Sequence, residues 1–178
     1  MIADDNIWCI DFEATGLEPL SYPVEVAVAN VVSGDVKAWL IRPIPVWIAR
    51  GPWDPKAIEM HGLTLERVIA EGISPSEVAE DLKEMVRGGR VLSDATAHDG
   101  KWLRELYGAV GYDNPPFRLH SLRDMEWDWG AHANGPAEVA IDAARTEVFA
   151  RFPQEHRAAP DAQRNAEILR QLRSVRTP

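Results

Sequence analysis

The chain has 178 residues, of which 46% are hydrophobic and 26% are charged, and its formal net charge at pH 7 is −9. This size and composition are ordinary for a globular protein, so we expect residues 1–178 to form a single domain. The negative charge argues against a protein that grips long duplex DNA through its phosphates alone. It does not exclude a nucleic-acid enzyme whose acidic residues are neutralised by bound cations.

Cellular location is constrained by three simple features. Cys9 is the one cysteine in the sequence, which excludes an intrachain disulfide. The first residues, MIADDNIW, lack the basic and apolar segments of a secretory signal. No window approaches the roughly 18 to 20 apolar residues of a membrane span. We therefore expect a cytoplasmic protein without a membrane partner.

The first 44 residues have the pattern of three strands. An apolar strand over Ile7–Phe12 is followed by a β-branched strand over Tyr22–Val32. Ser33–Asp35 is a turn signal, and a third strand follows over Val36–Ile44. Short turns between successive strands favour an antiparallel meander. Residues 43–57 contain four prolines and are predicted to form a loop; the prolines are Pro43, Pro45, Pro52 and Pro55.

Helical patterns dominate after residue 73. Ser74 is a predicted N-cap, with Pro75 at the first helical position and Glu77 completing a capping box. A short strand is predicted at about 90–95, then a helix over 100–111 and a strand over 117–122.

Two further helices are predicted to begin near Pro136 and Pro160. In the first of these, Val139, Ala143 and Val148 are expected to face inward. The order of three strands, helix, strand, helix, strand and helices indicates an α/β fold. Its five-stranded sheet is mixed, with an antiparallel meander and parallel strands, and is flanked by helices.

Asp11 and Glu13 stand out because the strand that carries them is otherwise apolar. Side chains two residues apart in a strand point to the same face, so these carboxylates lie roughly 7 Å apart along it. Two close anions repel each other, and burying them without a partner is unfavourable. A positive group is therefore expected beside them.

Three later residues extend this pattern. Asp99 follows a strand at the mouth of a helix, Asp161 lies in the first turn of the last helix, and His156 lies in the loop before it. Each has an ordinary explanation when taken alone: a strand end, an N-cap, a helix-start acid or a loop histidine. Their joint order along the chain favours a functional cluster.

The combined pattern resembles the DEDDh family of 3′–5′ exonucleases, with its DnaQ-like and oligoribonuclease-like members, over nearly the whole chain. The matching segments are DFEATGL with Asp11 and Glu13, MHGLT with His61, SDATAHDGKWL with Asp99, and HRAAPDA with His156 and Asp161. The resemblance implies a ribonuclease H-like fold.

The second motif departs from the family pattern. Family members usually carry His-Asn early in this motif, where this chain has Asp94 and Ala95. Either that local contact is missing, or Asp94 rather than Asp99 is the acid. Asp99 is favoured because of its position relative to Trp102 and Leu103.

The resemblance also implies the chemistry. Two divalent cations, Mg²⁺ or Mn²⁺, would flank the scissile phosphate, in keeping with a carboxylate ligand set. By resemblance, Asp11, Glu13 and Asp161 hold one cation, Asp11 also touches the second, and Asp99 supports the second directly or through water. His156 is the general base. The product is a nucleoside 5′-monophosphate.

The expected partner is the 3′ end of a single-stranded nucleic acid. By resemblance, the terminal nucleotide meets the turn Thr15, Gly16 and Leu17, and His61; simple turn chemistry and core packing are the alternatives for the turn. Without a long basic stripe, a short substrate is expected. RNA is favoured slightly over DNA, by similarity to oligoribonuclease and ribonuclease T. Formation of a homodimer stays open.

The alternative from another class is a catalytically retired exonuclease fold that binds nucleic acid or a partner protein without cutting. The intact acids and His156 argue against it. Trp127 and Trp129 could serve as a stacking surface, but core packing is the favoured role for both.

Overall fold

The computed structural model describes residues 6–51 and 53–175 and contains a five-stranded mixed sheet in the order β3-β2-β1-β4-β5. Its strands are β1 (Ile7–Ala14), β2 (Pro23–Asn30), β3 (Val36–Leu40), β4 (Arg90–Ser93) and β5 (Leu119–Ser121). β1, β2 and β3 pair antiparallel, whereas β4 is parallel to both β1 and β5. This confirms the predicted α/β class and the mixed sheet. β1 is two residues longer than expected, so both Asp11 and Glu13 lie within it.

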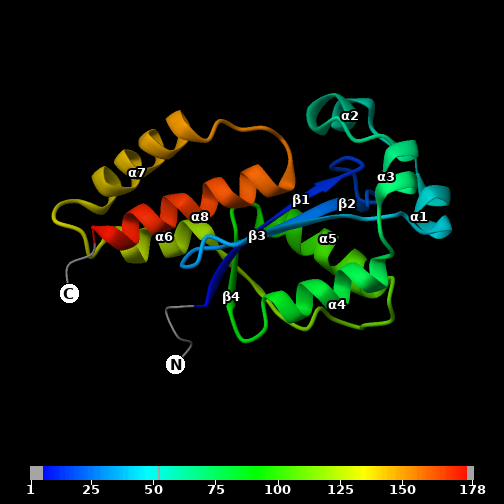
Figure 1. Ribbon diagram of the computed structural model, residues 1–178, viewed down its shortest axis with the longest axis horizontal. Helices are drawn as coiled ribbons and strands as arrows, with labels where there is room; N and C mark the ends of the chain where they lie inside the picture. The colour runs from blue at the N-terminus through cyan, green and yellow to red at the C-terminus, as the bar shows by residue number, and fades with distance from the viewer. Residues whose placement is uncertain (1–5, 52, 176–178) are drawn as a thin grey trace.

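Helices cover both faces of the sheet, and the helices of residues 45–71 gather beside one end of it (Figure 1). The helices are α1 (Pro45–Arg50), α2 (Pro55–His61), α3 (Leu65–Glu71), α4 (Pro75–Met85), α5 (Thr96–Gly108), α6 (Leu122–Gly130), α7 (Ala137–Arg151) and α8 (Ala158–Ser174). The capping box predicted for α4 is present between Ser74 and Glu77. Among the described helices, none is long and apolar enough to cross a membrane.

The loop predicted over residues 43–57 is wrong for part of its length, because α1 and the start of α2 lie there. Pro45 and Pro55 each occupy the first turn of a helix, where a missing backbone N–H is tolerated. Proline therefore starts these helices instead of preventing them. Pro52 lies outside the described residues.

The predicted inward face of α7 is only partly correct. Val148 is buried, but Val139 is 64% exposed, and the buried positions on the helix are Ile141, Ala144 and Val148. Apolar residues occur all round α7, so its sequence does not single out one face.

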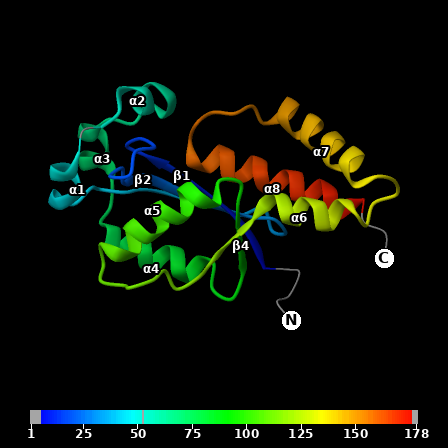
Figure 2. The same cartoon turned by 180° about the vertical axis from the view of Figure 1, so that it is seen from behind.

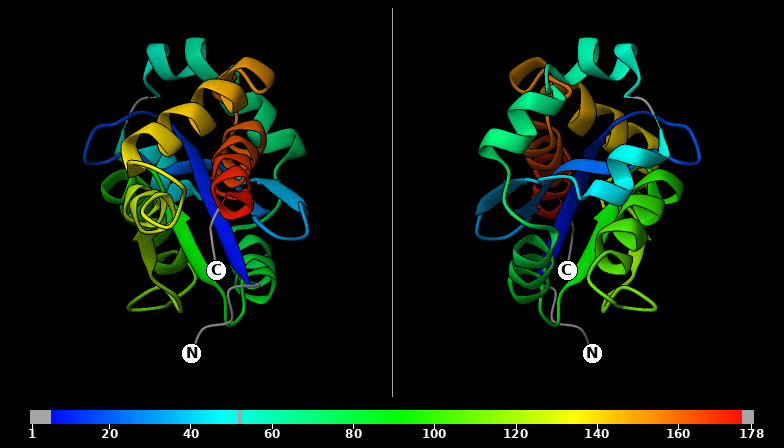
Figure 3. Two further views of the ribbon diagram at one scale, coloured as in Figure 1. Left: turned by 90° about the vertical axis from the view of Figure 1, so that its left-hand side faces the viewer. Right: turned by 90° about the vertical axis from the view of Figure 1, so that its right-hand side faces the viewer.

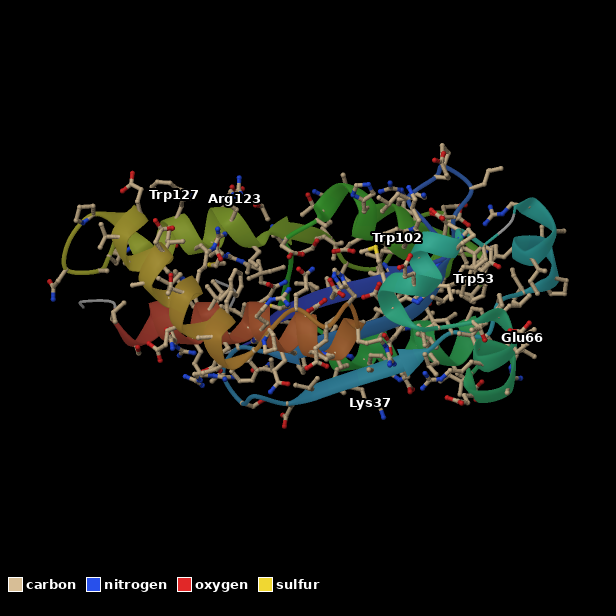
Figure 4. The ribbon with its side chains drawn as sticks, turned by 90° about the horizontal axis from the view of Figure 1, so that it is seen from above. Lys37, Trp53, Glu66, Trp102, Arg123 and Trp127 are labelled. Atoms are coloured by element: carbon tan, nitrogen blue, oxygen red, sulfur yellow. The ribbon has the colours of Figure 1, made fainter. Side chains whose placement is uncertain are left out.

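The core role predicted for the tryptophans of α6 holds for Trp129, which is buried, and is wrong for Trp127, which is 45% exposed. α6 itself was not predicted. Figure 4 shows Trp127 at the outer edge of this helix.

Two apolar cores lie on opposite faces of the sheet. In β1, Trp8, Ile10 and Phe12 face the core that includes α4 and α5, whereas Ile7 and Cys9 face the core that includes α6, α7 and α8. Figure 3 shows β1 in the middle of the molecule, with helices on both sides. The three later helices, α6, α7 and α8, pack together, and each contacts the other two (Figures 1 and 2).

Candidate functional site

The acidic cluster begins with the alternation of side chains along β1. Asp11 and Glu13 continue the series that Ile7 and Cys9 begin, so they point toward the face that α8 covers. α8 packs across β1 and β2 and brings Asp161, in its first turn, to the same place. Asp11 and Glu13 are partly buried and Asp161 is buried. The strand period and the docking of α8 together account for this half of the site.

Five carboxylates form two overlapping groups. One ligand oxygen from each of Asp11, Glu13 and Asp161 lies within 4.8 Å of the others, and the same holds for Asp11, Asp94 and Asp99. Asp11 belongs to both groups. The structure thus brings the predicted acids Asp11, Glu13, Asp99 and Asp161 together, and Asp11 lies between the two groups.

The second group includes both candidate acids of the unusual motif. Asp99 is 1% exposed in the first turn of α5 and accepts a hydrogen bond of 2.5 Å from Ser93 Oγ. Ala95 N–H donates to the same Ser93 oxygen at 3.0 Å. Asp94 is exposed and joins the group from the connection between β4 and α5. The choice between the two acids is thus not exclusive, since both face Asp11.

Burial and mutual repulsion raise the pKa of several of these carboxyl groups. Burial, followed by the negative charges of Glu25 and further acids, raises the pKa of Glu13 to about 8. Burial and the charge of Asp94 raise the pKa of Asp99 to about 7, although the hydrogen bond from Ser93 opposes the shift. For Asp11, burial and the surrounding carboxylates raise the pKa well above its usual range. The ionised forms of these carboxyl groups are therefore unfavourable without an added positive charge.

One arginine already neutralises part of this charge, although the sequence analysis assigned it no role. Arg164 Nη1 donates to Asp161 Oδ1 at 2.5 Å, one helical turn along α8, and both residues are buried. The guanidinium also lies 5.5 Å from the ring centroid of Phe149 on α7. Arg164 thus fixes the orientation of the Asp161 carboxylate.

A second ion pair fastens the segment that leads into α8. Glu25, on β2 opposite Glu13, is 3% exposed. It accepts hydrogen bonds from Arg157 Nε and Nη2 at 2.9 and 2.5 Å and from Ala158 N–H at 3.0 Å. A lone carboxylate in an otherwise apolar strand was the sequence signal for this contact. The pair ties the residue after His156 to the sheet.

His156 lies in the connection between α7 and α8, next to Arg157. It is half-buried, and its φ of 50° is in the left-handed region. Its ring nitrogens belong to neither group of clustered ligand atoms within the described residues. Gln154 Nε2 lies within hydrogen-bond distance of its ring Nδ1, at 3.5 Å.

A pocket of about 210 Å³ adjoins the acids at the end of β1. Its lining combines the turn after β1 with α2 and α5 and includes Glu13, Gly16, Leu17, Met60, His61 and Trp102. Leu17 and Met60 are 70% and 56% exposed, so this surface is apolar and open. Figure 4 shows Trp102 between α5 and the nearer end of α2.

The other two residues of the turn have structural partners. Thr15 is buried, its N–H donates to Tyr22 O at 3.0 Å, and its Oγ1 accepts from Tyr22 N–H at 3.2 Å. Gly16 has a φ of 151°, and a Cβ there would lie 3.1 Å from Asp54 Cβ, so the position suits glycine. Thr15 therefore shapes the turn from inside, and Leu17 is the residue of the three that projects outward.

His61 uses both ring nitrogens on the backbone. Leu63 N–H donates to Nδ1 at 3.0 Å, which leaves Nε2 to donate to Ala14 O at 3.1 Å. Burial also lowers the pKa of His61. Any contact of His61 with a nucleotide would therefore use the ring face or edge, while its nitrogens hold α2 against the end of β1.

The donor set of the acidic cluster fits hard divalent cations. All five candidate ligands are carboxylates, which Mg²⁺ and Mn²⁺ prefer, and the oxygens are already gathered within 4.8 Å. The raised pKa values of Asp11, Glu13 and Asp99 also indicate that a bound cation would stabilise their ionised forms.

Comparison with known families and structures agrees with this geometry. A family model described as RNase_T, exonuclease, matches residues 8–169. No curated protein sequence matches the chain.

Two solved structures illustrate the similarity in fold. Escherichia coli exonuclease I in complex with a dA16 oligonucleotide has a TM-score of 0.70 and 16% identity, over 95% of this chain and 41% of that one. A moderately thermophilic exonuclease I from Methylocaldum szegediense has a TM-score of 0.66 and 16% identity, over 94% and 40%. This chain spans about two fifths of the length of these proteins. The ribonuclease H-like fold expected from the sequence is thereby confirmed.

The raised pKa values predict that the metal-free protein loses stability as pH rises. A carboxyl group whose pKa is higher in the folded state than its unfolded value of about 4 binds its proton more tightly when folded. The stability that this tighter proton binding gives to the folded protein is therefore lost as the pH rises from about 5 to about 8, the pKa of Glu13 in the folded state. Melting temperatures in EDTA should fall over this window, and Mn²⁺ should restore most at the upper end. Glu13→Gln should flatten the profile; a wild-type melting temperature in EDTA that rises over this window would contradict the account.

The Glu25–Arg157 pair predicts a specific loss of stability. Arg157→Ala leaves a buried carboxylate without its charged partner and should lower the free energy of unfolding by about 3 kcal/mol, the low end for breaking a buried pair, because Arg157 is about 31% exposed. Urea unfolding measures this. Arg67→Ala, which breaks an exposed pair with Glu71, is the matched control and should have a much smaller effect. Equal losses in the two variants would show that the pair does not hold this segment.

Proposed function

The chain belongs to the RNase_T exonuclease family, and on that premise we propose that it is a metal-dependent 3′–5′ exonuclease that releases nucleoside 5′-monophosphates from single-stranded 3′ ends. The observation that carries the proposal is the convergence of five carboxylates from β1, the β4–α5 connection, α5 and α8, with Asp11 in both groups. A cluster of this charge has no evident structural use, because it raises the pKa values of its own members.

We assign the ligands by these two groups. Asp11, Glu13 and Asp161 hold one divalent cation, and Asp11, Asp99 and Asp94 hold the other. When bound, the cations neutralise the scissile phosphate and make a water molecule more acidic. Ser93 orients Asp99, and Arg164 orients Asp161, through their hydrogen bonds.

His156 is our candidate for the general base. It lies five residues before Asp161, in the connection that leads into α8, and an imidazole can accept a proton from water near neutral pH. The Glu25–Arg157 pair next to it limits the movement of the connection that carries it. In this scheme His156 takes the proton from the attacking water, and the carboxylates would hold the cations that position the phosphate.

The terminal nucleotide fits the apolar pocket beside the acids. Leu17 and Met60 present exposed apolar surface there, and Trp102 forms part of the lining. A base packed on Leu17 would leave its own 5′ phosphate next to Glu13. The pocket volume of about 210 Å³ suits a single nucleoside better than a longer segment.

We further propose that the enzyme acts distributively on short substrates, with RNA slightly preferred to DNA. The net charge of −9 supports few phosphate contacts and hence a shallow salt dependence. The similar exonuclease I structures include complexes with DNA oligonucleotides, so DNA is the obvious comparison. Matched RNA and DNA oligomers, single- and double-stranded, with Mg²⁺ or Mn²⁺, test the polymer preference. Equal or faster cleavage of DNA would reject a preference for RNA.

Removal of the cations should abolish turnover. We expect no mononucleotide release in EDTA and recovery with Mn²⁺ or Mg²⁺. Asp11→Asn should also be inactive at saturating metal, because Asp11 is the ligand shared by both groups. Its metal-free melting temperature should equal or exceed that of the wild type, since the substitution relieves repulsion. A variant with a near-normal rate would show that Asp11 does not bridge the two cations.

Loss of the general base should slow the reaction without loss of metal. We expect His156→Ala to lower the rate by roughly 10² to 10⁴-fold, the usual effect of removing such a group. Calorimetric titration with Mn²⁺ should give affinities close to those of the wild type. A normal rate at saturating metal combined with much weaker Mn²⁺ binding would instead make His156 a ligand.

The competing function is a module that binds nucleic acid without cutting it. The feature that favours it is the second motif, where Asp94 and Ala95 replace the usual His-Asn. Binding of a single-stranded oligomer without any metal-dependent release of mononucleotides would support this alternative.

A further inference from the structure

A groove of about 630 Å³ runs along α5 on the side away from the terminal-nucleotide pocket. α5 supplies Thr96, Gly100, Leu103 and Arg104, and the segment leading into β5 supplies the opposite wall, which includes Phe117 and Arg118. We propose that this groove, which we name the α5 groove, binds the phosphodiester backbone of the single strand upstream of the scissile bond. The proposal rests on the proposed function, because it takes the 3′ end to lie beside Leu17.

The first argument is the state of the two arginines. Most arginines in the described residues form ion pairs with an acidic side chain: Arg50, Arg67, Arg87, Arg145, Arg151, Arg157, Arg164 and Arg170. Arg104 and Arg118 are exposed and, like Arg42, Arg90 and Arg123, form no ion pair within the described part of the chain; what sets these two apart is that they line one groove together. In a protein with a net charge of −9, two unpaired guanidinium groups in one groove indicate an anionic ligand. Guanidinium groups match phosphate in both charge and geometry.

The second argument is the direction of the Arg104 side chain. Its Nη1 lies 3.5 Å from the point that a Cβ on Gly100 would occupy. The guanidinium therefore folds back over the first turn of α5, toward the residue that follows Asp99. The absence of a side chain at Gly100 leaves the space for this arrangement.

The third argument is the position of the groove relative to the acids. Asp99 lies in the first turn of α5, three residues after Thr96 and directly before Gly100, and both of these neighbours line the α5 groove. Farther along α5, Trp102 lines the other pocket, together with Glu13 and Leu17. A strand whose terminal nucleotide occupies that pocket therefore crosses the acids and enters the groove at Thr96. Leu103 is 2% exposed and Phe117 packs partly against the core, so the exposed Arg104 and Arg118 are the charged side chains in the groove that can meet the phosphates.

The test is equilibrium binding of labelled single-stranded oligothymidylates. The probes are a dinucleotide and an oligomer of about eight nucleotides, within the range of ~4–16 that one binding fold covers. The host protein is the full chain carrying Asp11→Asn, so that the probes stay intact. Arg104→Gln and Arg118→Gln are added singly and together. Arg42→Gln is the matched control, since Arg42 is exposed, forms no ion pair within the described residues, and follows β3 at the opposite edge of the sheet from β5. Figure 4 shows that edge at Lys37, across the molecule from Arg123 on α6.

We expect the double variant to bind the longer oligomer about tenfold or more weakly at low salt. The slope of log affinity against log salt should become shallower by about 1.4, the value for two lost contacts with a single strand. The dinucleotide should lose much less affinity, and Arg42→Gln should behave like the host protein. Unchanged affinity and slope for the longer oligomer, or equal losses for both probes, would overturn the proposal.

The groove and the proposed function fail in different ways. If binding of the longer oligomer depends on Arg104 and Arg118 but the wild type releases no mononucleotides, the groove stands and the exonuclease activity is rejected. If the wild type cleaves and the arginines do not affect binding, the activity stands and the groove is rejected.

Discussion

The repulsion among five carboxylates gathered around the C-terminal half of the central strand β1 is the constraint on which the site depends. Asp11 lies within reach of two separate pairs of acids, and burial removes the water that would otherwise screen them. Such a cluster is stable only if the surrounding helices and strands fix the acids in place and a bound cation neutralises their charge. The two apolar cores on either face of β1 stabilise this arrangement, because they fix the strand from which Asp11 and Glu13 project.

Some carboxylates at and beside the cluster are neutralised by arginines of the protein, whereas others are left to bind cations. Arg157 neutralises Glu25, and Arg164 neutralises part of Asp161, so two arginines of α8 and its leading segment serve the structure directly. Asp11, Glu13 and Asp99 have raised pKa values and are the groups for which bound cations matter most. In our proposal, Arg104 and Arg118 of the α5 groove form ion pairs with the phosphates of the substrate.

The sequence predicted the sheet well, and it singled out acids that the structure brings together, because both features follow local rules. The period of two in β1 placed Asp11 and Glu13 on one face, and capping residues marked α4. Local rules could not reveal α1 and α2, since proline is compatible with both a loop and a first helical turn. They also could not show that Glu25 meets Arg157, 132 residues away, or that His61 uses both nitrogens on the backbone. Those contacts arise only when α2 and α8 dock on β1.

The most direct test of the central claim is to locate cations in the folded protein. A crystal structure of the wild type in Mn²⁺, with anomalous scattering measured, should show one peak among Asp11, Glu13 and Asp161. A second peak should lie between Asp11 and the pair Asp94 and Asp99. In the same crystals Asp11→Asn should lose at least one peak. Mn²⁺ bound elsewhere, with the five carboxylates unoccupied at saturating metal, would contradict the account.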